Sequence, residues 1–501
     1  MRQLGLEGLL ASKACRERQL VLAMIAERLL HPRAKRGTTR LWHTTTLAEA
    51  LGVATAPEDD LYDAMDWLLA RQARIEYKLA QRHLGPGSHV LYDVTSSSDE
   101  GHTCPLACFG YNRDQKQGTT RIVYGVLTDR DGRPIAVQVY RGHTADPTTI
   151  PDQVAKLRTR FPLQRVVLVG DRGTLTQTHI DRLTQSPGRG WMAAWRVEAI
   201  RKLADTQPLD LSLGAPPPLA EITSAHLPGA RLMGCSTPLV AQERQRKRHA
   251  WLAATDKALA AIAREVAHRT KTPLAPAEMG KKIGKVLPHY HMAKHFVVQS
   301  TDNRLHYARR PEAMQREAEL DGLSVIRTSE PAERLSAEDA VRGSQSLAVV
   351  ERLFRTLQSI DILVRPIPHH QEKRVRAHIF LCVLAYYVAW SMRQALAPLL
   401  FDDEELEQNR NTRDPVAPAQ PSPAAQQKKA SRLTADGLPI HRFNTLLAAL
   451  GTRCRHRCRV TSGLDGLTFC QLTEPTPLQQ RAFQLLGLVF PVNRNSNSTE
   501  P

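Results

Sequence analysis

The stretch VLYDVTSS, residues 90–97, predicts a short buried strand with one carboxylate, that of Asp93, in its middle. Strands favour β-branched and aromatic side chains and avoid Asp, so an aspartate here costs stability and needs a reason. An edge position in contact with water is one reason, and a role in chemistry is the other. The strand by itself leaves both open.

The segments after this strand predict an ordered series of elements. In chain order these are strands at 120–128 and 134–140, a helix at 144–160 with Asp146 as its N-cap, a strand at 165–171 and a helix at 176–183. The turn at 129–132, DRDG, explains its own two acids without chemistry. Three antiparallel strands and a helical crossover to a parallel fourth strand bring Asp93 and Asp171 near one edge of a mixed sheet. The predicted fold is α/β and RNase H-like, with helices flanking the sheet.

A late amphipathic helix at residues 346–358 carries a third candidate acid, Glu351. Its apolar residues share one face: Val350, Leu353, Phe354 and Leu357. Glu351 lies beside that face, where it can point along the sheet edge and still reach a metal ion. A long helix at residues 371–396 is expected to pack behind it. Glu100 is the rival acid, because it is near Asp93 in the sequence, but it is expected in a loop.

Composition and periodicity divide the chain into six expected parts. They are a helical N-terminal domain at 1–87, with helices at 16–30, 46–53 and 58–82; the first part of the RNase H-like core at 88–189; a large insertion domain at 190–342; the second part of the core at 343–406; a flexible linker at 407–437; and a C-terminal tail at 438–501. The basic, helical N-terminal domain is a candidate DNA-binding module. A helix at 241–271 carries an apolar stripe that favours packing over ligand binding.

The overall charge favours a polyanionic partner, since 68 basic against 50 acidic residues give a net charge of +18. A generically basic protein is the alternative. The longest strongly apolar run, 379–390, is far below the roughly 20 residues that span a bilayer, and the N-terminus lacks a signal-like apolar core. We therefore expect a cytoplasmic, nucleoid-associated protein without a membrane segment.

The cysteines raise the question of zinc. Eight cysteines in 501 residues do not suggest a disulfide framework, and they fit a reducing compartment. Two groups could be imagined as zinc sites: Cys104 and Cys108 with His102, and Cys454, Cys458 and Cys470 with His456. Neither has a paired set of closely spaced ligands, so zinc is disfavoured.

Six segments together resemble a known family. They are LYDVTSS at 91–97, GYNRD at 110–114, IVYGVL at 122–127, VGDRG at 169–173, VERLFR at 350–355 and VRPI at 364–367. In this order they resemble the DDE transposases of bacterial insertion sequences, and within them the branch with a large insertion between the second Asp and the Glu. The resemblance covers roughly residues 16–405. It implies DNA cleavage at the ends of a mobile element and strand transfer into target DNA.

The resemblance further implies that Asp93, Asp171 and Glu351 are the catalytic, metal-binding triad, holding two Mg²⁺ or Mn²⁺ ions. The chemistry agrees, because two divalent ions activate the attacking oxygen and stabilise the leaving one, and Mg²⁺ prefers a few carboxylates plus substrate phosphate. The implied partners are the terminal inverted repeats, target DNA and a second copy of the chain in the synaptic complex. The residues expected to contact DNA are Arg172, Arg355, Gln358, Arg365, Lys281, Lys282 and Lys285.

Some positions depart from the family pattern. Ser344 and Gln358 stand where the family usually has Tyr and Lys, and Ser98-Asp99 replaces an aromatic pair. A glutamine cannot clamp a phosphate by charge as a lysine does. An N-terminal portion of the family is also expected to be missing. Two alternatives thus stay open: a decayed, transposase-derived DNA-binding protein, and an RNase H-like nuclease that cuts without joining.

Overall fold

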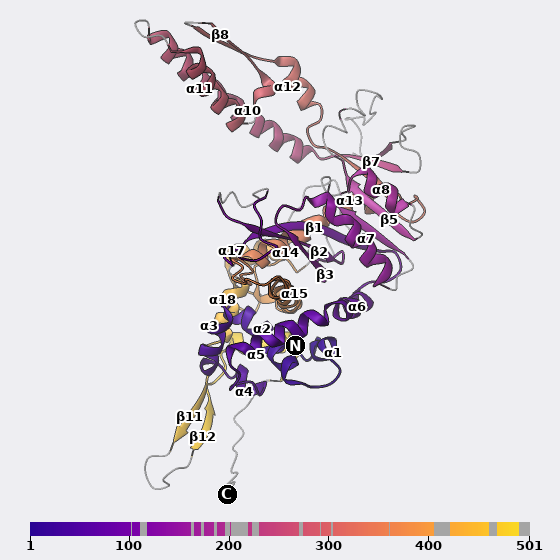
Figure 1. Ribbon diagram of the computed structural model, residues 1–501, viewed down its shortest axis with the longest axis vertical. Helices are drawn as coiled ribbons and strands as arrows, with labels where there is room; N and C mark the ends of the chain where they lie inside the picture. The colour runs from indigo at the N-terminus through magenta and orange to yellow at the C-terminus, as the bar shows by residue number, and fades with distance from the viewer. Residues whose placement is uncertain are drawn as a thin grey trace. The chain divides into compact units, whose positions relative to one another are not determined.

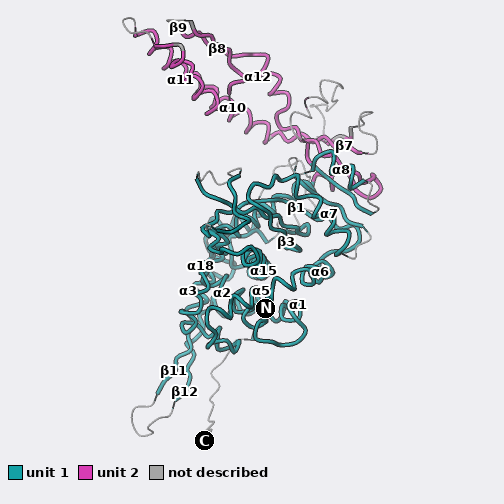
Figure 2. The backbone as a smooth tube through the Cα atoms, in the orientation of Figure 1, with its two compact units in different colours: residues 1–193, 342–413, 419–501 teal, residues 194–341, 414–418 magenta. Residues whose placement is uncertain are grey.

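The computed structural model divides into two compact units, drawn in different colours in Figure 2. The first comprises residues 1–193, 342–413 and 419–501, and the second comprises 194–341 and 414–418. The residues that the structure describes are 1–101, 103–110, 118–161, 165–171, 175–184, 188–195, 201, 219–222, 230–269, 274–290, 292–301, 304–359, 361–404, 421–459 and 468–489.

Five strands form the sheet of the first unit. They are β1 (Ser88–Ser98), β2 (Arg121–Thr128), β3 (Pro134–Arg141), β4 (Val166–Gly170) and β5 (Arg189–Ala194). Their order is β3-β2-β1-β4-β5; β1 is antiparallel to β2 and β2 to β3, whereas β4 is parallel to both β1 and β5 (Figure 1). This order is the RNase H-like one, so the predicted fold class is confirmed. Every residue of β2 and β4 is buried, as expected of strands covered on both faces.

The two faces of β1 meet different helices. Tyr92 points to one face, where its hydroxyl donates a hydrogen bond to Thr149 Oγ1 at 2.8 Å, beside the start of α7 (Ile150–Thr159). The chain passes so close here that a Cβ on Gly125 would lie 2.2 Å from the Tyr92 hydroxyl oxygen. Asp93 and Thr95 point to the opposite face because side chains alternate along a strand. That face is covered by α14 (Leu347–Gln358), which packs on β1.

Two more helices complete the crossover region. α7 follows the 3-10 turn η2 (Asp146–Thr149), and α8 (Gln177–Thr184) follows β4. The cap residue before η2 is Ala145, so the expectation that Asp146 is the N-cap is wrong; Asp146 is the first residue of the turn. The helical backbone starts at Asp146 itself, one residue earlier than predicted, so Asp146 lies inside the 3-10 turn and not before it.

The central helix of the first unit is α15 (Glu372–Ala395), which is buried along most of its length between the sheet and the N-terminal helices. Of the helices that the structure describes, it is the one long and apolar enough to cross a membrane by length and composition. Most of its apolar window is buried inside the fold, and a core helix passes the same test. Its apolar character is therefore explained by its central position.

The N-terminal region is helical, as predicted. Its elements are α1 (Leu6–Leu10), α2 (Arg16–Leu30), α3 (Lys35–Leu41), η1 (Trp42–Thr44), α4 (Leu47–Ala50), α5 (Glu58–Ala70) and α6 (Gln72–His83). The single helix predicted at 58–82 is wrong: it is split into α5 and α6. At Arg71 the backbone has φ −105° and ψ 0°, and its N–H bonds to the carbonyl of Leu68, which closes α5 with a tight final turn.

The second unit contains strands and long helices. Its elements are β6 (Leu219–Ile222), β7 (Arg231–Ser236), α10 (Pro238–His268), α11 (Pro276–His289), η3 (Ala293–His295), β8 (Phe296–Thr301), β9 (Arg304–Arg309), α12 (Pro311–Ala318) and β10 (Leu323–Thr328). β7 pairs antiparallel with β6 and β10, and β8 with β9. The predicted stripe of α10 packs in two small cores, Leu252 and Leu259 in one, Ile262 and Val266 in the other. Packing rather than ligand binding thus explains that stripe.

The remaining elements belong mainly to the first unit. They are α13 (Ala337–Gln345), η4 (Ala397–Leu399), α17 (Pro423–Ser431), α18 (Phe443–Leu450), β11 (Arg455–Arg459), β12 (Thr468–Leu472) and α19 (Pro477–Leu485). α17 corrects the expectation of a flexible linker over 407–437, of which residues 407–420 lie outside the described part. Ser422 caps this helix by accepting a bond from the Ala425 N–H, and Lys428 anchors it through the Ala397 carbonyl.

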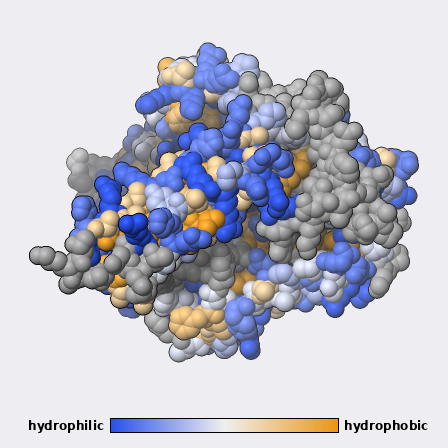
Figure 3. Space-filling view, turned by 90° about the horizontal axis from the view of Figure 1, so that it is seen from above, coloured by the Kyte–Doolittle hydropathy of each residue, from blue (hydrophilic) through white to orange (hydrophobic). Residues whose placement is uncertain are grey.

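Figure 3 shows one face of the molecule, where hydrophilic side chains predominate and hydrophobic ones form small separate patches.

Candidate active site

Asp93 and Asp171 lie at neighbouring positions of the sheet. The parallel register of β1 and β4 ends with Tyr92 beside Gly170, and each acid is the next residue along its chain. Paired parallel strands are about 4.8 Å apart, and residues at matching positions point to the same face. Asp93 is partly buried, with its Oδ1 accepting the Val94 N–H at 2.7 Å, whereas Asp171 is exposed. The structure therefore brings two of the three predicted acids together.

The third acid, Glu351, is positioned by two contacts of the α13–α14 segment with β1. In α13 (Ala337–Gln345), which precedes α14, a Cβ on Gly343 would lie 3.3 Å from His89 Nδ1. At its end, Gln358 Nε2 lies 3.1 Å from Thr95 Oγ1 and 3.0 Å from the carbonyl oxygen of Ser96. The end of α14 therefore lies beside Thr95 and Ser96 of β1.

The contacts of Gln358 give an expected level for Glu351 along the strand. Glu351 and Gln358 are seven residues apart and share one flank of α14, about 10.5 Å along the helix axis. The same length corresponds to about three residues of strand. Counting back from the Thr95 and Ser96 contacts, we expect Glu351 near the level of Tyr92 and Asp93.

The three acids nevertheless do not form a closed metal cage. Among the residues that the structure describes, no three His, Cys, Asp or Glu side chains are grouped so that they could hold a metal ion. The Glu351 side chain is 66% exposed, and its Oε2 lies 3.9 Å from Arg355 Nη2, one turn further on. The donor set is all carboxylate, which suits Mg²⁺, an ion that is commonly bound by one or two carboxylates plus waters and substrate phosphates. Asp93 and Asp171 carry carboxylates of the kind that such an ion takes.

Glu100 is too far along the chain to replace Glu351. β1 continues extended to Ser98, and the Glu100 N–H bonds to the Ile367 carbonyl at 2.9 Å beyond the strand end. Seven extended residues span roughly 23 Å, so Glu100 cannot share an ion with Asp93.

Gln358 has a role that the sequence did not suggest. Its amide nitrogen also lies 3.3 Å from the Tyr124 hydroxyl, which in turn is 3.0 Å from Ser97 Oγ. The amide donors are thus used inside the fold to tie α14 to β1 and β2, and the expected contact of Gln358 with DNA stays a prediction. The only sign of this structural role in the sequence was that glutamine replaces the lysine usual in the family. Ser344, the other departing position, lies in α13, near Gly343, and is partly buried.

The other residues expected to contact DNA are dispersed. Arg355 is 76% exposed on the flank of Glu351, whereas Arg365 is partly buried, with its Nε 3.4 Å from the Gln358 carbonyl oxygen. Lys281 and Lys285 are exposed on α11 of the second unit, and Lys282 there is paired with Glu265 at 2.6 Å. Arg172 lies outside the described residues. Only Arg355 is thus placed beside one of the three acids.

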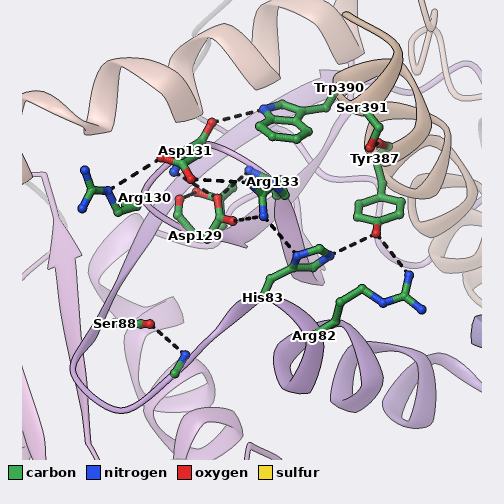
Figure 4. Close-up of polar contacts among 12 residues, drawn as sticks. Arg82, His83, Ser88, Asp129, Arg130, Asp131, Arg133, Tyr387, Trp390 and Ser391 are labelled. Carbon is green, nitrogen blue, oxygen red and sulfur yellow. Dashed lines mark hydrogen bonds and ion pairs between the residues drawn. The ribbon is translucent and has the colours of Figure 1, made fainter. Parts of the chain in front are cut away.

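A different acid cluster occupies the turn between β2 and β3 (Figure 4). Asp129 Oδ1 accepts hydrogen bonds from the N–H groups of Asp131 at 3.0 Å and Arg133 at 2.8 Å, and Oδ2 lies 3.6 Å from the Arg133 guanidinium. Burial raises the pKa of Asp129 to about 6, although the bonds from Arg133 oppose that shift. The sequence prediction that this turn needs no catalytic explanation agrees with these contacts.

Arg133 links this turn to the rest of the first unit (Figure 4). Its guanidinium lies 4.4 Å from the ring centroid of Trp390 on α15 and 3.2 Å from His83 Nδ1 on α6. His83 Nε2 is 3.0 Å from the Tyr387 hydroxyl. Burial, and then the charge of Arg133, lowers the pKa of His83 to about 4. The cluster joins sheet, α6 and α15, and is structural.

Of the two groups considered for zinc, the structure separates the members of one. In the β11–β12 hairpin, Cys470 pairs with Arg457, so it points to the face opposite Cys454, His456 and Cys458. In the other group, Cys104 is buried and Cys108 partly buried, while His102 lies outside the described residues. All eight cysteines are free thiols.

Comparisons with known proteins give little support from sequence. No protein-family model and no curated protein matches the chain. Among solved structures, the piggyBac transposase synaptic complex with hairpin DNA is similar at a TM-score of 0.28 and 10% sequence identity, over 85% of this chain and 84% of that one. At that TM-score the likeness carries no argument, so the RNase H-like assignment rests on the strand order and directions described above.

Proposed function

We propose that this protein is a DDE-type DNA transposase that cleaves DNA at the ends of an insertion sequence and joins the freed ends to target DNA. The observation that supports the proposal is the parallel register of β1 and β4, which ends at Tyr92 and Gly170, the residues directly before Asp93 and Asp171. Carboxylates at this edge of an RNase H-like sheet suit metal-assisted phosphodiester chemistry.

Asp93 and Asp171 would hold the divalent cation, Mg²⁺ or Mn²⁺, and Glu351 would complete the set from α14. When bound, a pair of such ions supplies an activated water or 3′-hydroxyl and stabilises the leaving oxygen. Arg355, one turn after Glu351, would contact the DNA backbone as a phosphate partner. The net charge of +18 supports a polyanionic substrate.

The finer features of the proposal follow from the sequence motifs. We infer a bacterial insertion-sequence enzyme that acts in the nucleoid, recognises terminal inverted repeats and works as a homodimer in the synaptic complex. Ser344 and Gln358 depart from the family pattern, and Gln358 is engaged in the fold. A transposase-derived DNA binder without catalysis is therefore the second candidate, favoured by those two positions.

The test is a cleavage and strand-transfer assay on DNA that carries the sequences flanking the gene, with Mg²⁺. Wild-type protein is expected to nick at the element ends and to join them to a plasmid. Asp93→Asn is expected to abolish both steps while keeping DNA affinity, and Glu100→Gln is the matched control that keeps both. Nicking without joining would instead identify a nuclease. DNA binding with neither step would identify the second candidate.

A further inference from the structure

The hairpin of β11 and β12 is a feature of the first unit that the candidate active site does not use. It extends away from the helices that precede and follow it (Figure 1). Of its ten strand residues, Cys458 and Leu472 are partly buried and the other eight are exposed. A two-stranded ribbon that buries so little surface is at best marginally stable by itself, so the rest of the fold has to hold it.

The other two-stranded sheet that the structure describes, β8 with β9, is covered on one side. Phe296 of β8 is 3% exposed and packs in a small core with Leu252 and Leu259 of α10. Leu305 of β9 is 8% exposed and packs in the neighbouring core. In the β11–β12 hairpin, by contrast, the aromatic ring of Phe469 belongs to a residue that is 46% exposed. Packing therefore explains the first hairpin and does not explain the second.

The root of the β11–β12 hairpin is held by hydrogen bonds. Arg453 Nη1 donates to the Thr473 carbonyl at 2.7 Å, and the Cys454 N–H donates to Thr473 Oγ1 at 3.0 Å. Just beyond the root, Gln479 Nε2 of α19 donates to the Ala449 carbonyl of α18 at 3.1 Å. These two helices share a hydrophobic core with the end of α15. The exposed ribbon thus starts from an anchored root.

The two faces of the ribbon differ in chemistry, because side chains alternate along a strand and residues in register share a face. The arginine face consists of Arg455, Arg457 and Arg459 of β11 with Leu472, Cys470 and Thr468 of β12. The opposite face consists of His456 and Cys458 with Gln471 and Phe469. Neither strand contains an acid. The connecting residues 460–467, which include Asp465, lie outside the described residues.

The three arginines have different surroundings. Arg455, nearest the root, pairs with Glu49 of α4 and so helps to hold the ribbon. Arg457 and Arg459 are exposed, and within the described ranges no carboxylate lies within ion-pair distance of either. Alternate residues of a strand are about 6.8 Å apart. Like charges in such a row repel one another, so the row does not stabilise the chain itself and instead suits a polyanion.

We propose that the arginine face of the β11–β12 hairpin binds double-stranded DNA, with the ribbon in the major groove and Arg457 and Arg459 on phosphates at its wall. The major groove is about 12 Å wide and admits a two-stranded β-ribbon. A guanidinium group matches two phosphate oxygens at once. The inference rests on the proposed function for its partner, DNA. It adds a contact surface outside residues 16–405, the part that resembles transposases.

The experiment is binding of duplex DNA by the full chain, measured by fluorescence anisotropy at several salt concentrations. The double variant Arg457→Gln/Arg459→Gln is expected to bind roughly tenfold more weakly at low salt. The slope of log affinity against log salt should become shallower by about 1.8, that is about 0.9 for each lost phosphate contact. The melting temperature should stay at the wild-type value, because both side chains are exposed.

The matched control is Arg158→Gln/Lys429→Gln, which removes two exposed charges from α7 and α17. It changes the net charge by the same amount as the hairpin variant, and it should keep the wild-type affinity and slope. A loss of affinity in the hairpin variant alone therefore reports contacts of the ribbon and not the overall charge of the protein.

Two native thiols report which face DNA covers. Cys470 is exposed on the arginine face, and Cys454 is exposed at the root on the opposite face. Labelling with a maleimide, followed by mass spectrometry of the peptides, measures the reactivity of each. Bound duplex is expected to slow the labelling of Cys470 and to leave that of Cys454 unchanged. Labelling of Cys470 at the same rate with and without bound DNA would overturn the proposal.

The outcomes of the binding experiment separate this inference from the proposed function. If the wild-type protein binds DNA and the hairpin variant binds like the control, the inference fails and the proposed function stands. If the wild-type protein does not bind duplex DNA, both fail. If the hairpin variant changes the sedimentation mass of the protein and not its DNA affinity, the ribbon is an interface between copies of the chain, which also overturns the inference.

Discussion

Two strand ends of the same sheet carry acids and treat them in opposite ways. After β2, Asp129 is 4% exposed, and the backbone and guanidinium of Arg133 bond to its carboxylate. After β4, Asp171 is exposed and stands beside Asp93 of the neighbouring parallel strand. The first acid stabilises a turn, whereas the second lies at the carboxyl edge where ligands of α/β sheets bind. An acid at the end of a strand thus indicates a catalytic site only when the matching position of the adjacent strand also holds an acid.

The largest effect is expected from neutralising Asp93 or Asp171. Asp93→Asn or Asp171→Asn should lower metal-dependent DNA cleavage by roughly a thousandfold or more, because the ligand charge that holds the cation is lost. The free energy of unfolding should change by less than about 1 kcal/mol, since Asp171 is exposed and Asp93 is only partly buried. Cleavage kinetics with a gel assay and urea denaturation measure the two quantities. A large loss of stability in Asp171→Asn would make that acid structural, like Asp129.

The reverse pattern is expected for the buried acid. Asp129→Ala removes the acceptor of two backbone N–H groups and the partner of Arg133, so it should cost about 2–4 kcal/mol of unfolding free energy. Urea midpoints at constant slope give that value. DNA cleavage by the folded fraction should stay within about threefold of wild type. Selective loss of cleavage with unchanged stability would break the comparison.

The pH dependence of stability provides a finer test of the same acid. Since burial raises the pKa of Asp129 from 3.8 in the unfolded chain to about 6, folding favours the protonated form. The stabilisation that Asp129 adds to the free energy of unfolding is therefore complete below pH 3.8. It is lost as pH rises through about 6, and the loss is at most about 3 kcal/mol. Subtracting the stability curve of Asp129→Asn from that of wild type isolates this change. A difference that is flat from pH 4 to pH 7 contradicts the burial of this carboxyl.

The smallest effect is expected at Gln358. Gln358→Ala should lower the free energy of unfolding by about 1–2 kcal/mol, because Thr95 and Ser96 lose the amide that joins α14 to β1. The rate of DNA cleavage should fall only slightly, and only because the loosened α14 holds Glu351 less firmly. Gln358→Lys tests whether the family's usual residue helps: higher DNA affinity with a steeper salt dependence would show that a clamp is missing. Hydrogen exchange at Thr95 and Ser96 reports the loosened tie in Gln358→Ala.

The sequence predicted the sheet because its strands depend on local pattern. Apolar runs such as 166–169 mark buried strands, and the crossover rule brings Asp171 beside Asp93. The break at Arg71, the helix α17 and the role of Gln358 could not be predicted, since each depends on contacts with residues far along the chain or on one backbone torsion.

The most direct test of the central claim is Mn²⁺ binding, measured by electron paramagnetic resonance as the loss of the free-ion signal during titration. Wild-type protein with duplex DNA is expected to bind Mn²⁺, and Asp93→Asn, Asp171→Asn and Glu351→Gln are each expected to weaken that binding by roughly tenfold or more. Glu100→Gln should bind as wild type does. Unchanged Mn²⁺ binding in Asp93→Asn and Asp171→Asn would contradict a metal site at the junction of β1 and β4.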